Sequence, residues 1–453
     1  MTASRLLPNP GGAGPEPGEA ALKRSRALID RIRAEMRPQG GHSEQNAALP
    51  FDGFMALALY APGLGYYQSQ DPKFGEPGDF ITAPEVSPLF SRCIARQVGE
   101  IIVELNGGEI FEVGAGSGVM AADIMDELAR QGTLPHRYLI LEKSPALGRR
   151  QQATLAARVP ELFHRFHWPD RLSEAASGET GFRGVILANE LLDALPACRF
   201  SLQGGAVLEW RVGWAEGRFV WRTAPARPAV AAAVRHTEKM LGRGLPDGYT
   251  SEAHLAQAAW VREAVGLLEA GLVLLVDYGY PRAEYYHPQR QDGALACHYR
   301  HRLHDDPFLL PGLQDISVHV DFSALAEAGL GEAGLVERSH RRMPPRAALA
   351  HAANPLDNRQ DPMDPTEGGN RRTPPRAALA GFTTQRDFLF STGLLEMCAH
   401  MDPTSREYLK LVQGIKTLTL PGEMGDMVKV MGFTKGIDRS LMGFKGRDLR
   451  GRL

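Results

Sequence analysis

Three glycines at alternate positions, Gly114, Gly116 and Gly118, lie in the stretch Glu109–Met125, which reads EIFEVGAGSGVMAADIM. The apolar run before them predicts a buried parallel strand, and the periodicity after them predicts a helix. Glycines between a strand and a helix let a ligand approach bare backbone beside the amides at the helix N-terminus. The carboxylate of Glu112 would repel a phosphate there and suits a cationic or hydroxyl-bearing ligand. The pattern therefore predicts a ligand site, although glycine-rich turns without a ligand also occur.

Acidic and amide side chains follow two further predicted strands. Glu142 ends the strand after the glycine turn, at about the distance at which a Rossmann-like unit places its ribose ligand. The apolar run Phe182–Asn189 predicts another buried strand, which leads into Asn189, Glu190 and Asp193 of NELLDALP. Because ligands bind outside the C-terminal strand ends of open α/β sheets, these three residues would lie beside the reactive end of the ligand. In the alternative interpretation Asp193 caps the next helix and Glu190 is solvated.

Two more stretches could contribute to this edge of the sheet. The strand predicted over Gly271–Gly279 carries Asp277 and Tyr278 at its C-terminal end. The stretch Gly75–Leu89, GEPGDFITAPEVSPL, is too polar and too broken by proline for a core element, and it precedes a helix predicted over Pro88–Leu105. We interpret it as a lid over the glycine-rich pocket, with an ordinary surface turn as the alternative. Its candidate polar residues are Asp79, Thr82 and Glu85.

The remaining elements must hold these strand ends together. Strand and helix patterns alternate along the chain, which predicts a doubly wound, mostly parallel α/β sheet. A hairpin over Phe200–Trp221, turning at Gly204-Gly205, would be inserted into it, together with a mostly helical stretch over Ala224–Val265 that is interrupted by GRGLPDGYTSE. The other predicted elements are helices over 21–36, Phe51–Leu59 and Ala146–Ala157, strands over His136–Lys143 and Met427–Lys435, and a strand-to-helix unit over Ser317–Ala326.

Composition excludes several classes of protein. At 453 residues the chain exceeds one ordinary domain, and its net charge of −2 argues against sequence-independent nucleic-acid binding. The four scattered cysteines argue against a disulfide framework or structural zinc and fit a reducing compartment. No apolar run could span a bilayer, and the N-terminus lacks the apolar core of a secretory signal. We expect a cytoplasmic protein without nucleic-acid or membrane partners, of undetermined oligomeric state.

Three histidines, His298, His301 and His304, recur at three-residue spacing. A metal site there is conceivable, but we find no strand or helix context for it in the sequence, and flanking arginines would oppose a cation. We therefore predict that the protein has no metal site.

A near-repeat interrupts the second half of the chain. RRMPPRAALA at Arg341–Ala350 recurs as RRTPPRAALA at Arg371–Ala380, with a polar, proline-rich linker between the copies. Two copies are too few for a solenoid, so we predict a disordered insertion. The resulting division is a disordered tail (1–20), a helical region with the lid (21–105), core (106–200), a hairpin and helical insertion (201–265), core (266–336), the duplicated insertion (337–380), core (381–440) and a solvated basic tail (441–453).

Several motifs together resemble one family. GLGYY, GDFITAPEVS, FEVGAGSG, LEKSPAL, NELLDALP, VDYG, HVDFSALA, GFTTQRDFL and MGFTK occur in order from about Phe51 to Lys435 and are similar to the MidA-type methyltransferases, a family that includes a mitochondrial complex I assembly factor. The resemblance implies a class I methyltransferase that uses S-adenosylmethionine (SAM), with a seven-stranded Rossmann-like core. It also implies that Gly114, Gly116 and Gly118 bound the methionine part of SAM and that Glu142 holds the ribose hydroxyls. The repeat insertion and the longer region before Phe51 depart from the family pattern but leave these motifs intact.

In the mitochondrial members the resemblance implies methylation of an arginine on a complex I subunit. A guanidinium is cationic and a poor nucleophile, so a carboxylate pair is needed to hold and orient it. We assign this role to Glu190 and Asp193, with a protein acceptor, and a mitochondrial matrix location if the source is eukaryotic. Two alternatives remain, a methyltransferase of small molecules and a SAM-binding assembly factor without catalysis. A nicotinamide oxidoreductase is disfavoured because the third glycine comes one residue too early.

Overall fold

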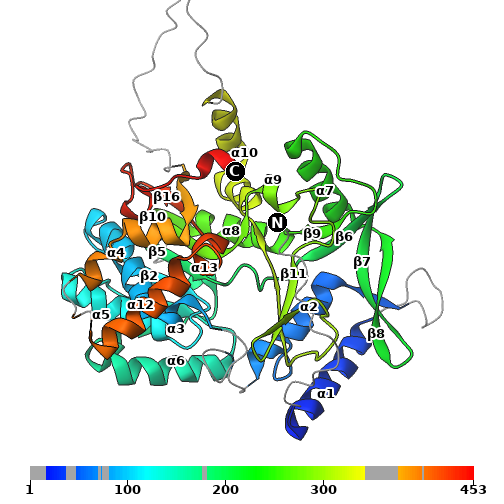
Figure 1. The fold of residues 1–453 in the computed structure, drawn as a ribbon, viewed down its shortest axis with the longest axis horizontal. Coiled ribbons are helices and arrows are strands. Elements are labelled where there is room, and N and C mark those ends of the chain that lie inside the picture. Colours follow the sequence, from blue (N-terminus) through cyan, green and yellow to red (C-terminus); the bar gives the residue numbers. More distant parts are fainter. Residues whose placement is uncertain are drawn as a thin grey trace, which may run out of the picture.

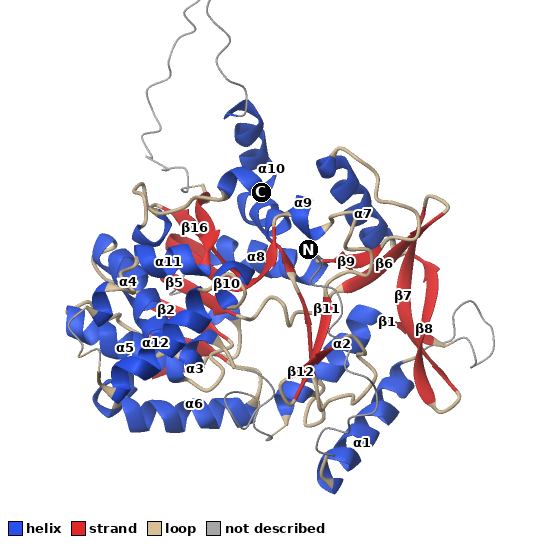
Figure 2. Cartoon of the chain, in the orientation of Figure 1, coloured by secondary structure: helices blue, strands red, loops and turns tan. Residues whose placement is uncertain are grey.

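The computed structural model describes residues 17–36, 47–69, 73, 81–175, 181–341, 376–399, 402 and 404–453. Figure 1 shows a large sheet flanked by helices, and beside it a group of strands that surrounds α2 (Phe51–Tyr60), next to α1 (Glu19–Glu35). Figure 2 shows the same division by type of element. Within the described ranges, no helix has the length and apolar character needed to cross a bilayer.

The core is a mixed sheet of eight strands. Seven lie side by side in the order β15-β16-β10-β5-β2-β3-β4, and the short β14 pairs with β10. Neighbours from β4 to β10 are parallel, whereas β16 is antiparallel to both β10 and β15. The predicted Rossmann-like sheet is confirmed. The bounds are β2 Glu109–Val113, β3 Tyr138–Leu141, β4 Phe166–His167, β5 Phe182–Asn189, β10 Leu268–Tyr280, β14 Val320–Asp321, β15 Ala378–Thr384 and β16 Val428–Lys435.

The register brings the C-terminal ends of the central strands to one edge. Val113, the last residue of β2, lies beside Leu141 at the end of β3 and beside Ala188 near the end of β5. The segments that follow these three strands therefore leave the sheet together, as expected for parallel strands joined by helices.

Helices cover both faces of the sheet. Ile94 of α4, Ile124 of α5 and Phe388 of α11 are buried with strand residues in one apolar cluster. Val261 of α8 and Leu325 of α10 belong to a second cluster on the opposite face. The helix bounds are α3 Ala83–Val86, α4 Pro88–Glu104, α5 Val119–Gln131, α6 Pro145–Arg158, α7 Pro228–Leu241, α8 Leu255–Leu267, α9 Arg282–Tyr285, α10 Phe322–Arg341, α11 Gln385–Ser391, α12 Arg406–Thr419 and α13 Met424–Met427.

Two smaller sheets complete the described fold. The predicted hairpin is a longer meander of three strands, although it turns at Gly204-Gly205 as expected. The expected break in the helical stretch after β8 contains a strand, β9, which begins within GRGLPDGYTSE and pairs with β6. The bounds are β1 Ala48–Pro50, β6 Cys198–Gln203, β7 Ala206–Ala215, β8 Arg218–Pro225 and β9 Thr250–Ala253 in one sheet, and β11 Leu295–Tyr299, β12 Arg302–His304 and β13 Asp315–Val318 in the other.

The predicted insertion over 337–380 is too long at both ends. Helical structure continues to Arg341 beyond a kink in α10 at Gly331, where φ is 65°, and β15 begins at Ala378, inside the second copy of the repeat. Leu379 is 8% exposed and lies opposite Phe433 of β16. The end of the second repeat copy is therefore part of the core sheet, because burial of its apolar side chain stabilises the strand. Residues 342–375 and 1–16, which we predicted to be disordered, lie outside the described residues.

The prediction of a solvated C-terminal tail is wrong. Phe444 is buried and meets Phe388 edge-on at a centroid distance of 5.7 Å. Leu449 is also buried, and its amide donates to the carbonyl of Phe382 at 2.7 Å. The basic side chains stay exposed while the apolar residues between them close the edge of the core.

We predict that Phe444→Ala lowers the free energy of unfolding by about 3 kcal/mol, because it leaves a cavity beside Phe388. Urea denaturation would measure the loss. The exposed neighbour Lys445 provides the control, since Lys445→Ala should change the same quantity by less than about 0.5 kcal/mol. Equal stability of both variants would contradict the packed tail.

Candidate cofactor and acceptor site

A cavity of about 330 Å³ lies at the edge where β2, β3 and β5 end. Residues from the glycine turn, from the ends of β3 and β5, from α3 and from the N-terminal region line it. Its polar lining comprises Tyr60, Tyr67, Gln68, Thr82, Glu85, Glu112, Ser117, Glu142, Lys143, Ser144, Asn189 and Glu190. The volume is at the lower end of the range for small-molecule sites, about 300–1,000 Å³.

The glycine turn requires conformations that other residues rarely adopt. Gly114, Gly116 and Gly118 have φ angles of 74°, 53° and 82°, all in the left-handed region. Before them, Glu112 is 1% exposed and accepts a hydrogen bond of 2.8 Å from the hydroxyl of Tyr138. Burial raises the pKa of Glu112 to about 7. Its second oxygen, Oε1, is buried without a hydrogen-bond partner.

Glu142 is held by the helix that follows β3. Its Oε1 accepts from the amide of Ser144 at 2.7 Å, and its Oε2 accepts from Nε2 of Gln151 at 2.9 Å. The same Gln151 nitrogen donates to the carbonyl of Gly116 at 3.2 Å, and Trp168 donates to the Gln151 oxygen. Gln151 therefore connects the glycine turn to Glu142, the residue predicted to bind the ribose, and fixes the orientation of both.

Glu190 lies just beyond β5 in a strained backbone conformation. Its φ angle is 48°, which is uncommon for a residue other than glycine and often accompanies function. The side chain lines the cavity and accepts a hydrogen bond of 3.1 Å from the amide of Ala83 in α3. Burial raises the pKa of Glu190 to about 7. Beside it, Asn189 also lines the cavity, and its Oδ1 is buried without a partner.

Further carboxylates lie behind Glu190 rather than in the cavity lining. Asp277 is 1% exposed and accepts from the amides of Leu192 and Tyr278, each at 2.8 Å. Burial, and then the charge of Asp277, raises the pKa of Asp193. No lysine, arginine or histidine of the described residues is ion-paired with Glu190, Asp193 or Asp277. Around Glu190 the described residues therefore provide further carboxyl groups but no cation that is paired with them.

Two residues of the stretch that we interpret as a lid lie at the cavity. Thr82 and Glu85 line the cavity, and the hydroxyl of Ser117 donates to Oε1 of Glu85 at 2.5 Å. The short helix α3 is thereby attached to the glycine turn as well as to Glu190. Asp79 lies outside the described residues.

Several residues of the site were missed by sequence analysis. Tyr60 and Tyr67 reach the cavity from the N-terminal region, and Trp260 reaches it from α8. The hydroxyl of Tyr67 donates to Oδ1 of Asp315 on β13 at 2.9 Å. The only available signal was the GLGYY turn, which fixes local geometry but does not show which part of the fold it faces.

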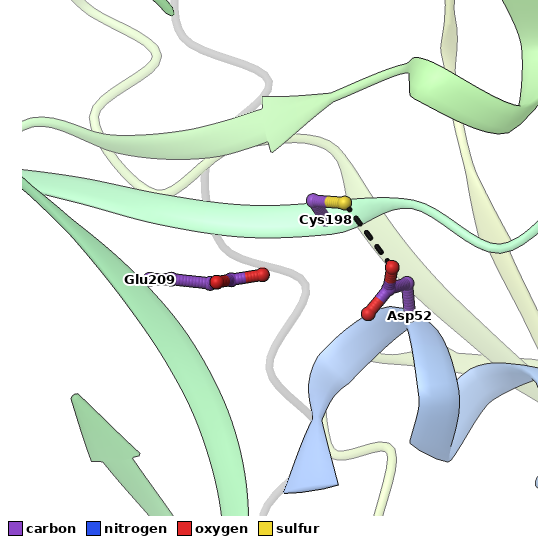
Figure 3. Close-up of side chains that lie close together, drawn as sticks. All are labelled: Asp52, Cys198 and Glu209. Atoms are coloured by element: carbon purple, nitrogen blue, oxygen red, sulfur yellow. Dashed lines mark hydrogen bonds between the residues drawn. The ribbon is translucent and has the colours of Figure 1, made fainter. Parts of the chain in front are cut away.

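One other group of side chains has the types that hold metal ions. Figure 3 shows Asp52, Cys198 and Glu209, with a hydrogen bond between the thiol of Cys198 and the carboxylate of Asp52. Arg227 donates to Oδ2 of Asp52 at 2.8 Å and, through Nε, to Oε1 of Glu209 at 2.8 Å. The guanidinium of Arg227 thus already bridges the two carboxylates of this group, which joins α2 to the β6–β7 pair.

The histidine series has more regular structure around it than expected. His298 and His304 lie on the antiparallel strands β11 and β12, and His301 is at the turn with a φ angle of 61°. We had found no strand context for these residues, which was wrong. Among the described residues they form no cluster with metal-ligand spacing.

The hydrogen-bonding groups of the cavity fit SAM. The unpartnered oxygens of Glu112 and Asn189 can accept from an ammonium group, and the carboxylate of Glu142 can accept from ribose hydroxyls. The left-handed glycines leave bare backbone beside them. The cationic sulfonium of SAM also suits the negative charge around Glu190.

We predict that Gly114→Val weakens SAM binding about 10- to 100-fold. A side chain at a φ angle of 74° is strained, and its Cβ would lie 3.1 Å from Cδ1 of Leu191. Titration calorimetry with SAM measures the effect. The control is Gly148→Ala in α6, where an added Cβ meets nothing within 4 Å. Unchanged SAM affinity in Gly114→Val would argue against this site.

Comparison with solved structures supports the same cofactor. The chain is 36% identical to a Burkholderia thailandensis protein crystallised with S-adenosylhomocysteine bound, with a TM-score of 0.80 and coverage of 97% of this chain and 100% of the other. Among curated proteins it is 23% identical to the Drosophila melanogaster "Protein arginine methyltransferase NDUFAF7 homolog, mitochondrial", over 93% of this chain and 88% of the relative. The mouse protein arginine methyltransferase NDUFAF7 is 28% identical, over 62% of this chain and 66% of the relative.

The family model that matches this chain covers residues 93–339, more than half of its length. That segment contains the glycine turn, Glu142 and the β5 turn, and its boundaries enclose the sheet edge around the cavity. The chain belongs to the family described as "Putative S-adenosyl-L-methionine-dependent methyltransferase" and uses SAM as its cofactor.

Proposed function

We propose that this methyltransferase is a protein arginine N-methyltransferase whose acceptor is a subunit of respiratory complex I or a similar protein. The observation that carries the proposal is the set of carboxylates around Glu190 without a cationic partner in the described chain. A guanidinium entering the cavity would supply the missing positive charge. The names of the relatives, which are arginine methyltransferases, support the same acceptor.

On this proposal the cofactor lies along the ends of β2 and β3. Gly114, Gly116 and Gly118 bound its methionine part, while Glu112 and Asn189 accept from its ammonium group. Glu142 holds the ribose hydroxyls, oriented by Gln151. Glu190, at the end of β5, would then lie beside the bound cofactor, because it lines the same cavity.

When bound, the cofactor supplies an electrophilic methyl group on a sulfonium. Glu190 binds the acceptor guanidinium, orients one nitrogen toward the methyl group and accepts the proton that this nitrogen loses. The nitrogen–carbon bond forms as the carbon–sulfur bond breaks, and the sulfur keeps the electron pair. The acceptor keeps its single positive charge, and one proton is released to solvent through Glu190. Asp193 and Asp277 lie outside the cavity lining, and Asp277 anchors the turn beside Glu190 by accepting from the amides of Leu192 and Tyr278.

We predict that Glu190→Gln lowers the rate of methyl transfer about 100-fold or more, while SAM affinity changes less than about twofold. The amide can hydrogen-bond but can neither offset positive charge nor accept the proton. The assay follows labelled methyl groups from SAM into arginine residues of isolated complex I subunits, with methylarginine identified by mass spectrometry. The exposed Glu263→Gln in α8 is the matched control. Parallel loss of SAM binding and turnover would contradict the assigned role.

We also predict that kcat/KM for the acceptor rises with pH through about 7. The pKa of Glu190 is raised to about 7, chiefly by burial, so the carboxylate is protonated below that pH. Activity should fall about tenfold for each pH unit below the midpoint. The Glu190→Gln variant should lack this step. If its residual activity kept the same step, another group, such as Asp277 with its pKa also raised to about 7, would be responsible.

A further inference from the structure

Two stacked tyrosines form one wall of the cavity. Tyr60 and Tyr67 have ring centroids 5.6 Å apart and an interplanar angle of 17°, and both line the cavity with Glu190. Both lie outside residues 93–339, the segment that the family model matches. The wall is thus contributed by a part of the chain that carries none of the cofactor motifs.

The turn between the two tyrosines depends on glycine. The amide of Gly65 donates to the carbonyl of Ala61 at 2.8 Å, directly after α2. A Cβ on Gly65 would lie 2.7 Å from the carbonyl oxygen of Leu59, so a larger residue would displace the turn. This close turn places the ring of Tyr67 back over that of Tyr60, the last residue of α2.

Both hydroxyl groups are used within the protein. The hydroxyl of Tyr60 donates to the carbonyl of Ala194 at 2.9 Å, in the turn after β5. The hydroxyl of Tyr67 donates to Asp315 at 2.9 Å. With their donors engaged, the rings offer a ligand mainly the aromatic surface that is left open by their own stacking and by the edge contact between Tyr66 and Tyr67. The negative face of an aromatic ring attracts cations, and a planar guanidinium stacks on it better than a compact ammonium does.

The charges around the tyrosines belong to the β5 and β13 side of the cavity. Burial and then the charge of Asp315 raise the pKa of both phenols, and Asp193 also contributes to both. The wall lies next to the turn after β5 and to β13, because Tyr60 donates to the carbonyl of Ala194 and Tyr67 donates to Asp315. A cation held there would meet a carboxylate and an aromatic surface together.

We propose that Tyr60 and Tyr67 determine acceptor specificity by stacking on a planar cation, the guanidinium of a peptide arginine, while Glu190 binds its nitrogen atoms. Asp315 is a positioning residue that fixes Tyr67. This inference rests on the proposed function and adds to it the residues that distinguish arginine from lysine. The competing assignment is that the same wall covers the cofactor, because the charge of Glu142, the residue predicted to bind the ribose, also raises the pKa of Tyr60.

The test uses the full chain loaded with S-adenosylhomocysteine and two peptides, acetyl-Gly-Gly-Arg-Gly-Gly-amide and its lysine counterpart. Calorimetry should show about five- to twentyfold tighter binding of the arginine peptide to the unmodified protein. Tyr60→Leu should remove most of this preference and leave the affinity for S-adenosylhomocysteine within about twofold. Tyr60→Phe and Tyr67→Phe keep the rings and should retain most of the preference.

Three results would overturn the proposal. One is equal affinity of the unmodified protein for both peptides, which needs no variant. Another is a Tyr60→Leu protein that keeps the full preference for the arginine peptide. The third is a Tyr60→Leu protein whose affinity for S-adenosylhomocysteine falls as much as its affinity for the arginine peptide. If Tyr60→Leu does not fold, as judged by its melting temperature, the same measurements on Tyr67→Leu and the unmodified protein decide.

Methyl transfer, measured separately, distinguishes this inference from the proposed function. If the protein binds the arginine peptide selectively but forms no methylarginine from SAM, the proposed function is rejected and the role of the tyrosines in recognition stands. If the unmodified protein and a folded Tyr60→Leu variant form methylarginine equally well, the proposed function stands and the role of the tyrosines in recognition is rejected.

Discussion

The turn after β5 is the constraint on which the site depends. The amide of Glu190 donates to the carbonyl of Val276 at 2.8 Å, so β5 and β10 remain paired up to the point where the chain turns. The left-handed conformation at Glu190 then reverses the chain, and the amide of Leu192 reaches the carboxylate of Asp277. One local arrangement thereby presents the Glu190 side chain to the cavity and anchors the segment to the neighbouring strand.

Keeping several carboxylates near one another in a poorly hydrated edge opposes folding. The raised pKa values of Glu112, Glu190 and Asp277 express this cost, because burial disfavours the charged form in each case. The two apolar clusters on the faces of the sheet stabilise the fold enough to keep the groups in place. A cationic ligand would relieve the repulsion, so the same feature that destabilises the empty edge favours binding there.

The cofactor half of the site could be predicted from the sequence because its signals are local. β5 has the predicted bounds, and the glycine turn, Glu142 and Glu190 meet at one edge as the topology rule requires. The start of β15 and the role of the C-terminal tail were missed, because both depend on partners distant in sequence. Both stretches are mostly polar in sequence, which predicts solvent exposure, but a few apolar residues in them, such as Leu379 and Phe444, are buried in the core. Asp315 and the tyrosine wall were missed for the same reason, since no local pattern joins them.

The hydrogen bond between Tyr67 and Asp315 joins positions 248 residues apart. The wall that it fixes and the glycine turn are therefore encoded in separate stretches of the gene. If the tyrosines select the acceptor as we propose, a substitution at Tyr60 or Tyr67 changes the chemical group that is accepted without altering the glycine turn that holds the methyl donor. Divergence of substrate among related proteins would then appear in two distant places, at the tyrosines before residue 93 and at Glu190 and Asp315 after it, while a shared donor would preserve the glycine turn.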